Sequence, residues 1–500
     1  MNEAPRYIRI GRSDNVAVAL TDLPAGETIR IGELEVKLRN AIGRGHKFAL
    51  TAIPAGSPVI KYDMPIGEAT SDIEPGSFVH THNIKTRLSG QLEYTYEPVP
   101  ATSLPKVEGR TFRGYRRADG TVGIRNDLWI IPTVGCVNKL AENLAKEFSK
   151  RLPDGDVRRV LAFPHPYGCS QLGDDHATTA NMLASLVRHP NAGGVLVVAL
   201  GCENNTLESF RERLGSFDES RVRFLKAQED GGEFEKGLAL LEELREQAAR
   251  QKRVEIPASE LKVGLKCGGS DGLSGITANP LIGRFSDLLV AAGGTTVLTE
   301  VPEMFGAETL LMNRCVDRKV FDECVKMING FKEYFLRHNQ VVYENPSPGN
   351  KAGGISTLEE KSLGCTQKGG TSQVTDVLHY GEQLRTPGLN LLTGPGNDMV
   401  ATTVLAAAGA QLVLFSTGRG TPFGGPVPTV KIATNSELAE RKPNWIDFNA
   451  GKLVKGGTDL ETLGAELFEY VLKLASGEVE ARNETYGYQE IAIFKDGVTL

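Results

Sequence analysis

Three Gly-Cys pairs, each placed directly after an apolar run, recur every 33 residues in the first half of the chain. The pairs are Gly135-Cys136, Gly168-Cys169 and Gly201-Cys202. They close the apolar runs 128–131, 160–163 and 195–198, and helix-like sequence follows each pair. Alternating strands and helices predict βαβ units and a parallel sheet. In open sheets of this kind ligands bind at the carboxyl ends of the strands, which is where these cysteines would lie.

The chain has 500 residues, too many for one hydrophobic core, so several domains are expected. Its net charge of −6 gives no sign of a nucleic-acid groove or a membrane surface. No signal peptide is visible at the N-terminus, and no apolar run is long enough to cross a bilayer. The seven cysteines form no dense framework, which favours reduced thiols and a cytoplasmic protein.

Composition and periodicity divide the chain into four segments. Residues 1–96 read as short strands separated by Pro-Ala-Gly turns, and residues 97–112 form a Pro-rich linker. An α/β domain is predicted over 113–254, with an amphipathic helix at 233–252. A second α/β domain is predicted over 255–500.

Histidines in the N-terminal segment are candidates for a metal site. His46 lies in GRGHKFAL, and His80 and His82 lie in FVHTHN. If 77–82 is a strand, histidines at i and i+2 point to the same face, and imidazoles with open positions suit Fe(II), Mn(II) or Zn(II). The alternative is a pair of partly exposed histidines with no ligand. Lys61, in the same segment, strengthens the interpretation as a site.

Polar loops after the predicted strands offer further candidates. HPYGCSQLGDDH contains Tyr167 and His176, and its alternative role is to cap a helix. Ser270 and Asp271 precede a predicted helix N-terminus, a favourable place for a carboxylate. Basic side chains that could hold an acid substrate, or that are ordinary surface charges, are Arg284, Lys351, Lys368 and Arg419. The chain has no Walker A motif, and no GxGxxG opens the first α/β unit, which disfavours nucleotide binding.

Cysteines on separate loops can also converge on an iron–sulfur cluster. Cys136, Cys202 and Cys365 form the candidate set for this minority hypothesis, although tight CxxC spacings are absent. The alternative is that these cysteines are buried packing residues.

Long motifs spread over the whole chain resemble the altronate and galactarate dehydratase family, which also includes sulfolactate sulfo-lyase. They are GHKFAL, KYDMPIG, VHTHN, GYRRADGTVGIRNDLWIIPTVGCVN, YGCSQLGDDH, LGCENN, KCGGSDGLSGITANPLIGRFSD, TEVPEMFGAE, ENPSPGNKAGG, KSLGCTQK and STGRGTPFGGPVPTVKIATN. The resemblance implies an α/β fold with a small N-terminal β-clip (SAF-type) domain followed by two α/β domains with mainly parallel sheets. In one respect the chain departs from the family pattern, because Asp63 stands where glycine is expected.

The family resemblance implies a hydro-lyase that converts D-altronate to 2-dehydro-3-deoxy-D-gluconate and water in hexuronate catabolism. Fe(II), with Mn(II) as a substitute, is the implied cofactor. His46, His80 and His82 are the candidate metal ligands, and the candidate catalytic residues are His46, Lys61, His82, Tyr167 and His176. The expected partner is a small sugar acid, with neither nucleic acid nor membrane, in a homo-oligomer. Two alternatives stay open: dehydration of galactarate or another sugar acid, and a non-catalytic sugar-acid sensor.

Overall fold

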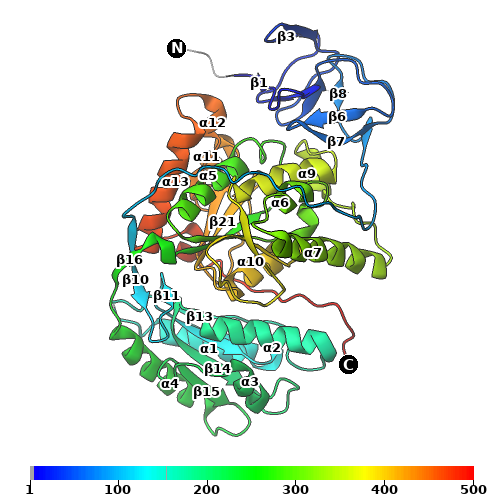
Figure 1. Cartoon of the computed structure of the whole chain (residues 1–500). Helices are drawn as coiled ribbons and strands as arrows, with labels where there is room; N and C mark the ends of the chain where they lie inside the picture. The colour runs from blue at the N-terminus through cyan, green and yellow to red at the C-terminus, as the bar shows by residue number, and fades with distance from the viewer. Residues whose placement is uncertain (1–4, 154) are drawn as a thin grey trace.

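The N-terminal module and the second domain lie at opposite ends of the molecule, and the C-terminal domain lies between them (Figure 1). The computed structural model describes residues 5–153 and 155–500. No helix in this part of the chain is long and apolar enough to cross a membrane. The prediction of a mixed α/β fold with a small N-terminal β domain is confirmed.

Short strands build the N-terminal module, as the turn signals predict. They pair in the orders β1-β2-β5-β8, β3-β4 and β6-β7-β9. Gly26 and Gly56 end the two Pro-Ala-Gly turns with φ of 83° and 76°, a backbone conformation that favours glycine. The strands are β1 (Tyr7–Ile8), β2 (Val16–Ala19), β3 (Thr28–Ile31), β4 (Leu34–Lys37), β5 (Lys47–Ala49), β6 (Pro58–Lys61), β7 (Met64–Ala69), β8 (Phe78–Val79) and β9 (Ile84–Lys85).

The segment after β9 is docked on the C-terminal domain along much of its length. Its trace crosses that domain before it enters β10 (Thr111–Arg116) (Figure 1). The Tyr94 hydroxyl donates to Glu308 at 2.5 Å, and the Tyr96 hydroxyl donates to the Cys315 carbonyl at 2.7 Å. The residues just before the Pro-rich linker therefore help to hold the N-terminal module against the C-terminal domain.

A four-stranded parallel sheet with the order β13-β12-β14-β15 forms the second domain. Leu128 and Ile130 of β12 pack against α1 and α4, whereas Trp129 and Ile131 pack against α2 and α3. Both faces are thus covered, which explains the continuous apolar runs in the sequence. The elements are β12 (Asp127–Pro132), α1 (Asn138–Ser149), β13 (Val160–Ala162), α2 (Gly173–Arg188), β14 (Ala192–Ala199), α3 (Leu207–Leu214), β15 (Val222–Lys226) and α4 (Glu233–Ala249).

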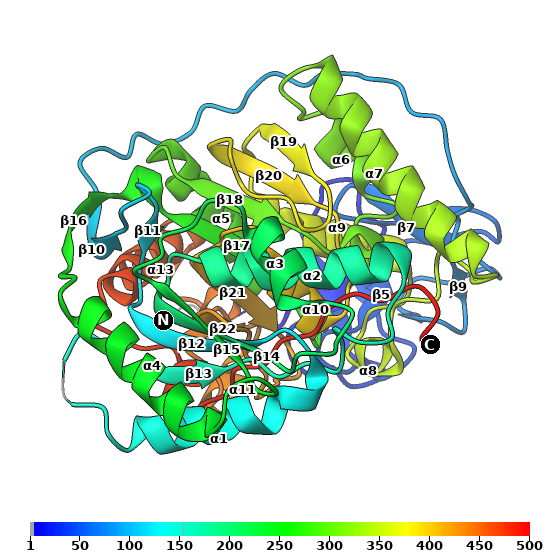
Figure 2. The ribbon, with the colours of Figure 1, turned by 90° about the horizontal axis from the view of Figure 1, so that it is seen from below.

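The C-terminal domain contains a seven-stranded parallel sheet with the order β19-β20-β18-β17-β21-β22-β23. Helices α5 and α13 belong to the core on one side, and α10 belongs to the core shared with α2 of the second domain. Seen from below, α2 and α10 lie next to each other (Figure 2), and residues of the two helices are in contact. The strands are β17 (Lys262–Cys267), β18 (Thr295–Leu298), β19 (Val374–Leu378), β20 (Gly388–Leu392), β21 (Leu412–Thr417), β22 (Thr429–Ala433) and β23 (Phe448–Asn449).

Ten α-helices are described in the C-terminal domain, and a small antiparallel sheet, β11-β10-β16, joins this domain to the second one. The helices are α5 (Ala278–Ala291), α6 (Glu308–Met312), α7 (Arg318–Arg337), α8 (Pro348–Ala352), α9 (Leu358–Cys365), α10 (Asp398–Ala407), α11 (Ser436–Arg441), α12 (Lys452–Lys455), α13 (Leu460–Ala475) and α14 (Arg482–Thr485). The remaining elements are β11 (Val122–Gly123), β16 (Val254–Pro257) and the 3₁₀ helices η1 (Gly135–Val137), η2 (Ala258–Glu260), η3 (Val301–Glu303) and η4 (Thr366–Gly369).

Glu484 of α14 forms a buried ionic clamp between the C-terminal and second domains. Its carboxylate accepts from Arg125 at 2.7 and 2.8 Å and lies 2.5 Å from Arg159. Burial alone would raise the pKa of Glu484, but the two guanidinium groups outweigh it and lower this pKa to about 2.

We expect Glu484→Gln to lower the free energy of unfolding by about 3–5 kcal/mol at pH 7, because it leaves the buried Arg125 without a counter-charge and leaves Arg159 to pair with Asp127 at 3.2 Å. The pKa is depressed, so the stabilisation is present above the unfolded value of about 4.3 and is lost as the pH falls towards 2. Urea unfolding between pH 7 and 3 measures both effects. The matched control is Glu480→Gln, whose exposed carboxylate pairs with Arg158 at 3.4 Å. If Glu484→Gln and Glu480→Gln had equal free energies of unfolding at pH 7, Glu484 would not stabilise the contact between the two domains.

Candidate functional site

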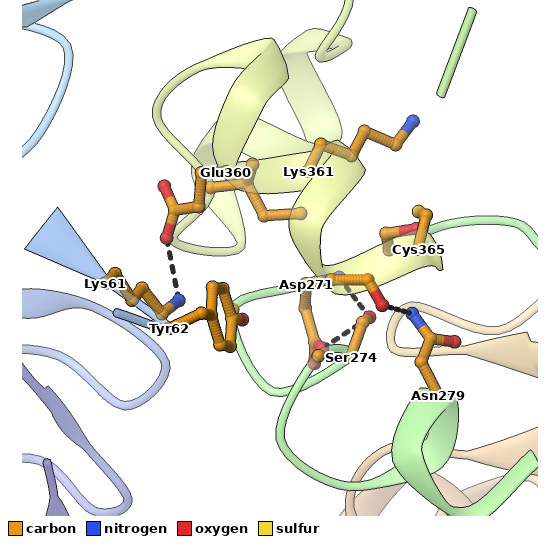
Figure 3. A pocket seen from close by; sticks show the side chains of 13 residues that line it. Lys61, Tyr62, Asp271, Ser274, Asn279, Glu360, Lys361 and Cys365 are labelled. Atoms are coloured by element: carbon orange, nitrogen blue, oxygen red, sulfur yellow. Dashed lines mark hydrogen bonds and ion pairs between the residues drawn. The ribbon is translucent and has the colours of Figure 1, made fainter. Parts of the chain in front are cut away.

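A small pocket of about 10 Å³ lies between the N-terminal module and the C-terminal domain. Lys61 and Tyr62 reach it from the module, and the loop after β17 and helix α9 supply the opposite walls (Figure 3).

Tyr62 and Asp63 have φ of 63° and 58° in the tight turn between β6 and β7. Glycine is the usual residue in this conformation. Asp63 departs from the pattern, and its carboxylate accepts from the backbone and side chain of Ser13 at 2.6 and 2.7 Å.

The module and the C-terminal domain touch through backbone at glycines. A Cβ atom on Gly272 would lie 1.9 Å from the carbonyl oxygen of Gly45, so a side chain there would force the parts away from each other. Gly272 also donates to the carbonyl of Gly353 at 2.8 Å. These contacts bring the sequence around His46 next to the loops of the C-terminal domain.

Glu360 of α9 binds two lysines of the N-terminal module. Its two oxygens accept from Lys47 and Lys61, each at 2.8 Å, and all three side chains are at most 1% exposed. Burial alone would raise the pKa of Glu360, but the two ammonium groups outweigh it and lower this pKa to about 2. Burial lowers the pKa of Lys47 to about 8 although Glu360 opposes the shift. For Lys61 the attraction of Glu360 outweighs burial, so its pKa is raised.

Glu300 binds two lysines of the C-terminal domain in the same way. Its carboxylate lies 2.6 Å from the ammonium of Lys266 and 3.1 Å from that of Lys368, with all three side chains buried. Burial raises the pKa of Glu300 to about 7 although both lysines oppose the shift. Glu300 also accepts from the backbone of Cys267 at 2.9 Å, which ties it to the loop that lines the pocket.

A third buried group joins a carboxylate, a lysine and two thiols. Glu303 lies 2.8 Å from Lys361 and 3.1 Å from the Cys365 sulfur. A hydrogen bond with the thiol of Cys365 is the main cause that holds the pKa of Cys267 well below its usual value. The same contact raises the pKa of Cys365.

These groups bring buried charges of both signs together at the site. Five buried lysines face three buried glutamates: Lys47, Lys61, Lys266, Lys361, Lys368, Glu300, Glu303 and Glu360. Asp271, which lines the pocket, and Asp398, which lies 2.9 Å from Lys266, add further carboxylates. Lys61 and Lys361 line the pocket, so their ammonium groups can pair with the carboxylate of a small substrate and can stabilise negative charge that develops next to it.

The N-terminal histidines gather around the ring of Phe78. The ring centroids of His46, His80 and His82 lie 5.4, 5.6 and 5.5 Å from that of Phe78. The prediction that 77–82 is a strand with both histidines on one face is wrong, because β8 ends at Val79 and the chain then turns. As a result His80 is half-buried, with its Nδ1 3.1 Å from the Ser356 hydroxyl, whereas His82 is exposed.

Ser270, Asp271 and Lys368 of the predicted substrate residues lie in this region. Ser270 and Asp271 line the pocket, and Lys368 holds Glu300. Lys351 lies in α8, close to the Gly353 contact, and Arg419 is exposed beside Gly269, with its backbone bonded to that residue at 2.9 Å. These last two residues border the site without lining the pocket.

Arg284, Tyr167 and His176 are not brought into this pocket. Arg284 pairs with Glu461 and lines a different cavity, because α5 turns that face towards α13. Tyr167 and His176 belong to the loop and first turn of α2, and the second domain lies at the opposite end of the molecule from the N-terminal module (Figure 1). The structure therefore does not place them with His46 and Lys61.

The candidate cluster set Cys136, Cys202 and Cys365 does not converge. Cys365 is buried in the C-terminal domain against Cys267 and Glu303, whereas Cys136 and Cys202 are exposed on the second domain. In the second domain the strand order β13-β12-β14 places Cys169, instead of Cys365, on a loop next to those of Cys136 and Cys202.

Several central residues were not among the predicted site residues: Lys47, Lys266, Lys361, Glu300, Glu303 and Glu360. Lys47 and Lys266 each stand within short apolar strand sequences, KFAL and VGLKC, where a charged side chain has to find a partner when it is buried. This signal could have singled them out. Glu360, in STLEEKSLGC, had no such signal, because charged residues are common in the exposed parts of helices.

Comparison with known proteins gives matches over nearly all of the chain. Three family models match: altronate/galactarate dehydratase SAF domain at 5–87, D-galactarate dehydratase/altronate hydrolase second domain at 114–249, and D-galactarate/altronate dehydratase C-terminal at 258–499. An altronate dehydratase of Bacillus subtilis is 55% identical over 99% of both chains. An altronate dehydratase of Escherichia coli is 56% identical over 99% of this chain and 100% of its own length. A galactarate dehydratase (L-threo-forming) of Escherichia coli is 35% identical over 98% of this chain and 96% of its own.

Proposed function

Because the chain belongs to the altronate and galactarate dehydratase family, we propose that it converts D-altronate to 2-dehydro-3-deoxy-D-gluconate and water. Two altronate dehydratases match it at 55 and 56% identity, against 35% for the galactarate dehydratase, which supports altronate as the substrate. The reaction would belong to hexuronate catabolism in the cytoplasm, and the working form would be a homo-oligomer.

The reaction removes the C2 proton of the sugar acid and expels the C3 hydroxyl as water. The C2 proton is weakly acidic because the charge left behind spreads into the neighbouring carboxylate, so cationic groups around that carboxylate lower the barrier. The enol product then becomes the 2-keto acid by moving a proton from oxygen to C3. The observation that carries the proposal is the pocket itself, which Lys61, Lys361 and Glu360 line together.

Two histidines supply candidate ligands for the divalent ion that the family resemblance implies, although no three Cys, His, Asp or Glu side chains of the described residues form a complete metal site. The His46 Nδ1 is buried without a hydrogen-bond partner among the described residues. Burial and Lys47 lower the pKa of both His46 and His80, the latter to about 4, so both rings are neutral and able to ligate at pH 7. We propose that these two imidazoles hold Fe(II) or Mn(II), and that the exposed His82 lies at the outer edge of this metal site. Such an ion supplies Lewis-acid stabilisation of charge on a substrate oxygen.

Metal removal should abolish most of the activity, and Fe(II) or Mn(II) should restore it. His46→Ala should weaken Mn(II) binding to the chelator-treated protein by more than about 100-fold, because loss of an outer-shell partner alone costs about 10–100-fold and this variant removes a direct ligand. Mn(II) binding can be followed by electron paramagnetic resonance, independently of turnover. The matched control is His338→Ala, an exposed histidine that pairs with Asp496. Unchanged Mn(II) affinity of the His46 variant would exclude this ligand set.

Release of 2-keto acid from altronate, galactarate, gluconate and mannonate tests the function directly. We expect the highest kcat/KM for altronate in the metal-loaded protein. A preference for galactarate would favour the alternative substrate with two carboxylates. Sugar-acid binding without release of 2-keto acid from any of the four would overturn the proposal in favour of a sensor.

A further inference from the structure

The three Gly-Cys loops of the second domain lie side by side, because the strands that they follow are adjacent in the order β13-β12-β14. Backbone and side-chain hydrogen bonds connect the three loops. Gly135 donates to the carbonyl of Tyr167 at 2.8 Å, and Asn205 donates to the carbonyl of Gly168 at 3.0 Å. The backbone of Ser170 donates to the Asn204 side chain at 2.8 Å. The 33-residue repeat in the sequence therefore becomes one continuous edge in space.

The glycines of these pairs are required for the close approach of the loops. A Cβ atom on Gly168 would lie 2.0 Å from the carbonyl oxygen of Thr133, and one on Gly135 would lie 2.8 Å from that of His165. Gly168 also has a φ of 96°. A larger residue at either position would separate the loops, so the Gly-Cys pairing keeps the three cysteines on neighbouring backbones.

The cysteines of these loops are exposed, unlike the other cysteines of the chain. Cys136, Cys169 and Cys202 are exposed free thiols, whereas the remaining four are buried. Free cysteine is among the most often buried residue types, so three exposed thiols at one edge of a sheet call for another explanation than packing. Their position at the carboxyl ends of parallel strands is where ligands bind in such sheets.

A buried donor in the loop of Cys169 has no hydrogen-bond partner among the described residues. Gln171, two residues after Cys169, is only 3% exposed, and its Oε1 accepts from Gly168 at 3.1 Å. Its Nε2 has no hydrogen-bond partner among the described residues. Donors of this kind commonly bond to the sulfur atoms of metal–thiolate sites.

We propose that Cys136, Cys169 and Cys202 together bind an iron–sulfur cluster, at a site distinct from the lysine-rich pocket. Thiolate sets select soft metal centres. In the part of the chain that the structure describes, no three Cys, His, Asp or Glu side chains form a site for one ion. A cluster of several irons binds each thiolate through a different iron, so its thiolates lie farther apart than those on one ion, and three thiolates leave one iron for a ligand other than cysteine.

The test is the iron and acid-labile sulfide content of the full chain, purified without oxygen and reconstituted with Fe(II) and sulfide. We expect equal amounts of iron and sulfide above any mononuclear iron, with visible absorption that air bleaches. Cys136→Ser, Cys169→Ser and Cys202→Ser should each lower the sulfide content at least fivefold, and the triple variant should contain none. The control is Cys324→Ser, a buried cysteine of α7, which should keep wild-type content.

A second measurement does not depend on the folding of any variant. In the wild-type protein, alkylation followed by mass spectrometry should find the three thiols protected together until the cluster is removed. Absence of sulfide from the reconstituted protein, zinc as the bound metal, or normal sulfide in the triple variant would each overturn the proposal. Sulfide content and thiol protection are measured without turnover. A negative result would therefore contradict the cluster and leave the dehydratase proposal untouched.

Discussion

Glu360→Gln is expected to lower kcat/KM at least 100-fold and the free energy of unfolding by about 3–5 kcal/mol. The carboxylate of Glu360 is the shared counter-charge of Lys47 and Lys61, each 2.8 Å away and buried. A neutral amide of the same shape leaves two buried ammonium groups without compensation. The variant therefore loses both the position of the lysines and part of the contact between the N-terminal module and α9. Keto-acid release and urea unfolding at pH 7 measure the two effects.

The neighbouring glutamate provides a matched control. Glu359 lies on the same helix and is also buried, but it accepts from Thr86 and from the backbone of Arg87, outside the pocket. We expect Glu359→Gln to keep activity within threefold of wild type. The double variant Glu360→Gln with Lys61→Met removes one of the unpaired charges and should recover stability without recovering activity. Wild-type activity in Glu360→Gln would contradict the role of this pocket in the reaction.

Lys61→Met should reduce kcat/KM at least 100-fold while the fold stays intact. Lys61 lines the pocket, and Glu360 still has Lys47 at 2.8 Å when Lys61 is replaced, so no buried carboxylate is left alone. The raised pKa of Lys61 keeps it protonated between pH 6 and 9, which makes it a cation for the substrate carboxylate and not a base. We therefore expect a large increase in KM and an unchanged shape of the pH–rate profile.

An exposed lysine of the same module serves as the control for Lys61. Lys85 pairs with Glu68 at 2.9 Å and its side chain is 60% exposed, so Lys85→Met should change neither kcat nor KM by more than twofold. If Lys61→Met retained wild-type KM, the N-terminal module would not contribute a side chain to substrate binding.

The regular elements of this protein are visible in its sequence because their signals are local. The runs 128–131 and 195–198 lie within β12 and β14, and the run 160–163 extends one residue beyond β13. The predicted helix at 233–252 corresponds to α4. Continuous apolar runs, amphipathic periodicity and Pro-Ala-Gly turns each act over a few residues. The error at 77–82 has the same origin, because alternation alone cannot show that the chain turns after Val79.

The functional site is different, since its contacts join residues that are far apart in the chain. Lys47 and Glu360 are 313 residues apart, and Lys266 and Glu300 are 34 apart. Lys61, Ser270, Asp271 and Lys368 could be selected as polar residues in polar loops, but not paired with their partners. Arg284, Tyr167 and His176 had equally suitable local sequences, and packing placed them elsewhere.

The sequence by itself determined the strands at 128–131, 160–163 and 195–198, the helix at 233–252, the division into a β module and α/β domains, and the Gly-Cys edge of the second domain. Only the tertiary structure decided which charges meet, because a buried lysine is stable only where folding supplies its carboxylate. The cysteines show the same division. Their spacing predicted a shared edge, and the strand order β13-β12-β14 decided that Cys169, not Cys365, stands beside Cys136 and Cys202.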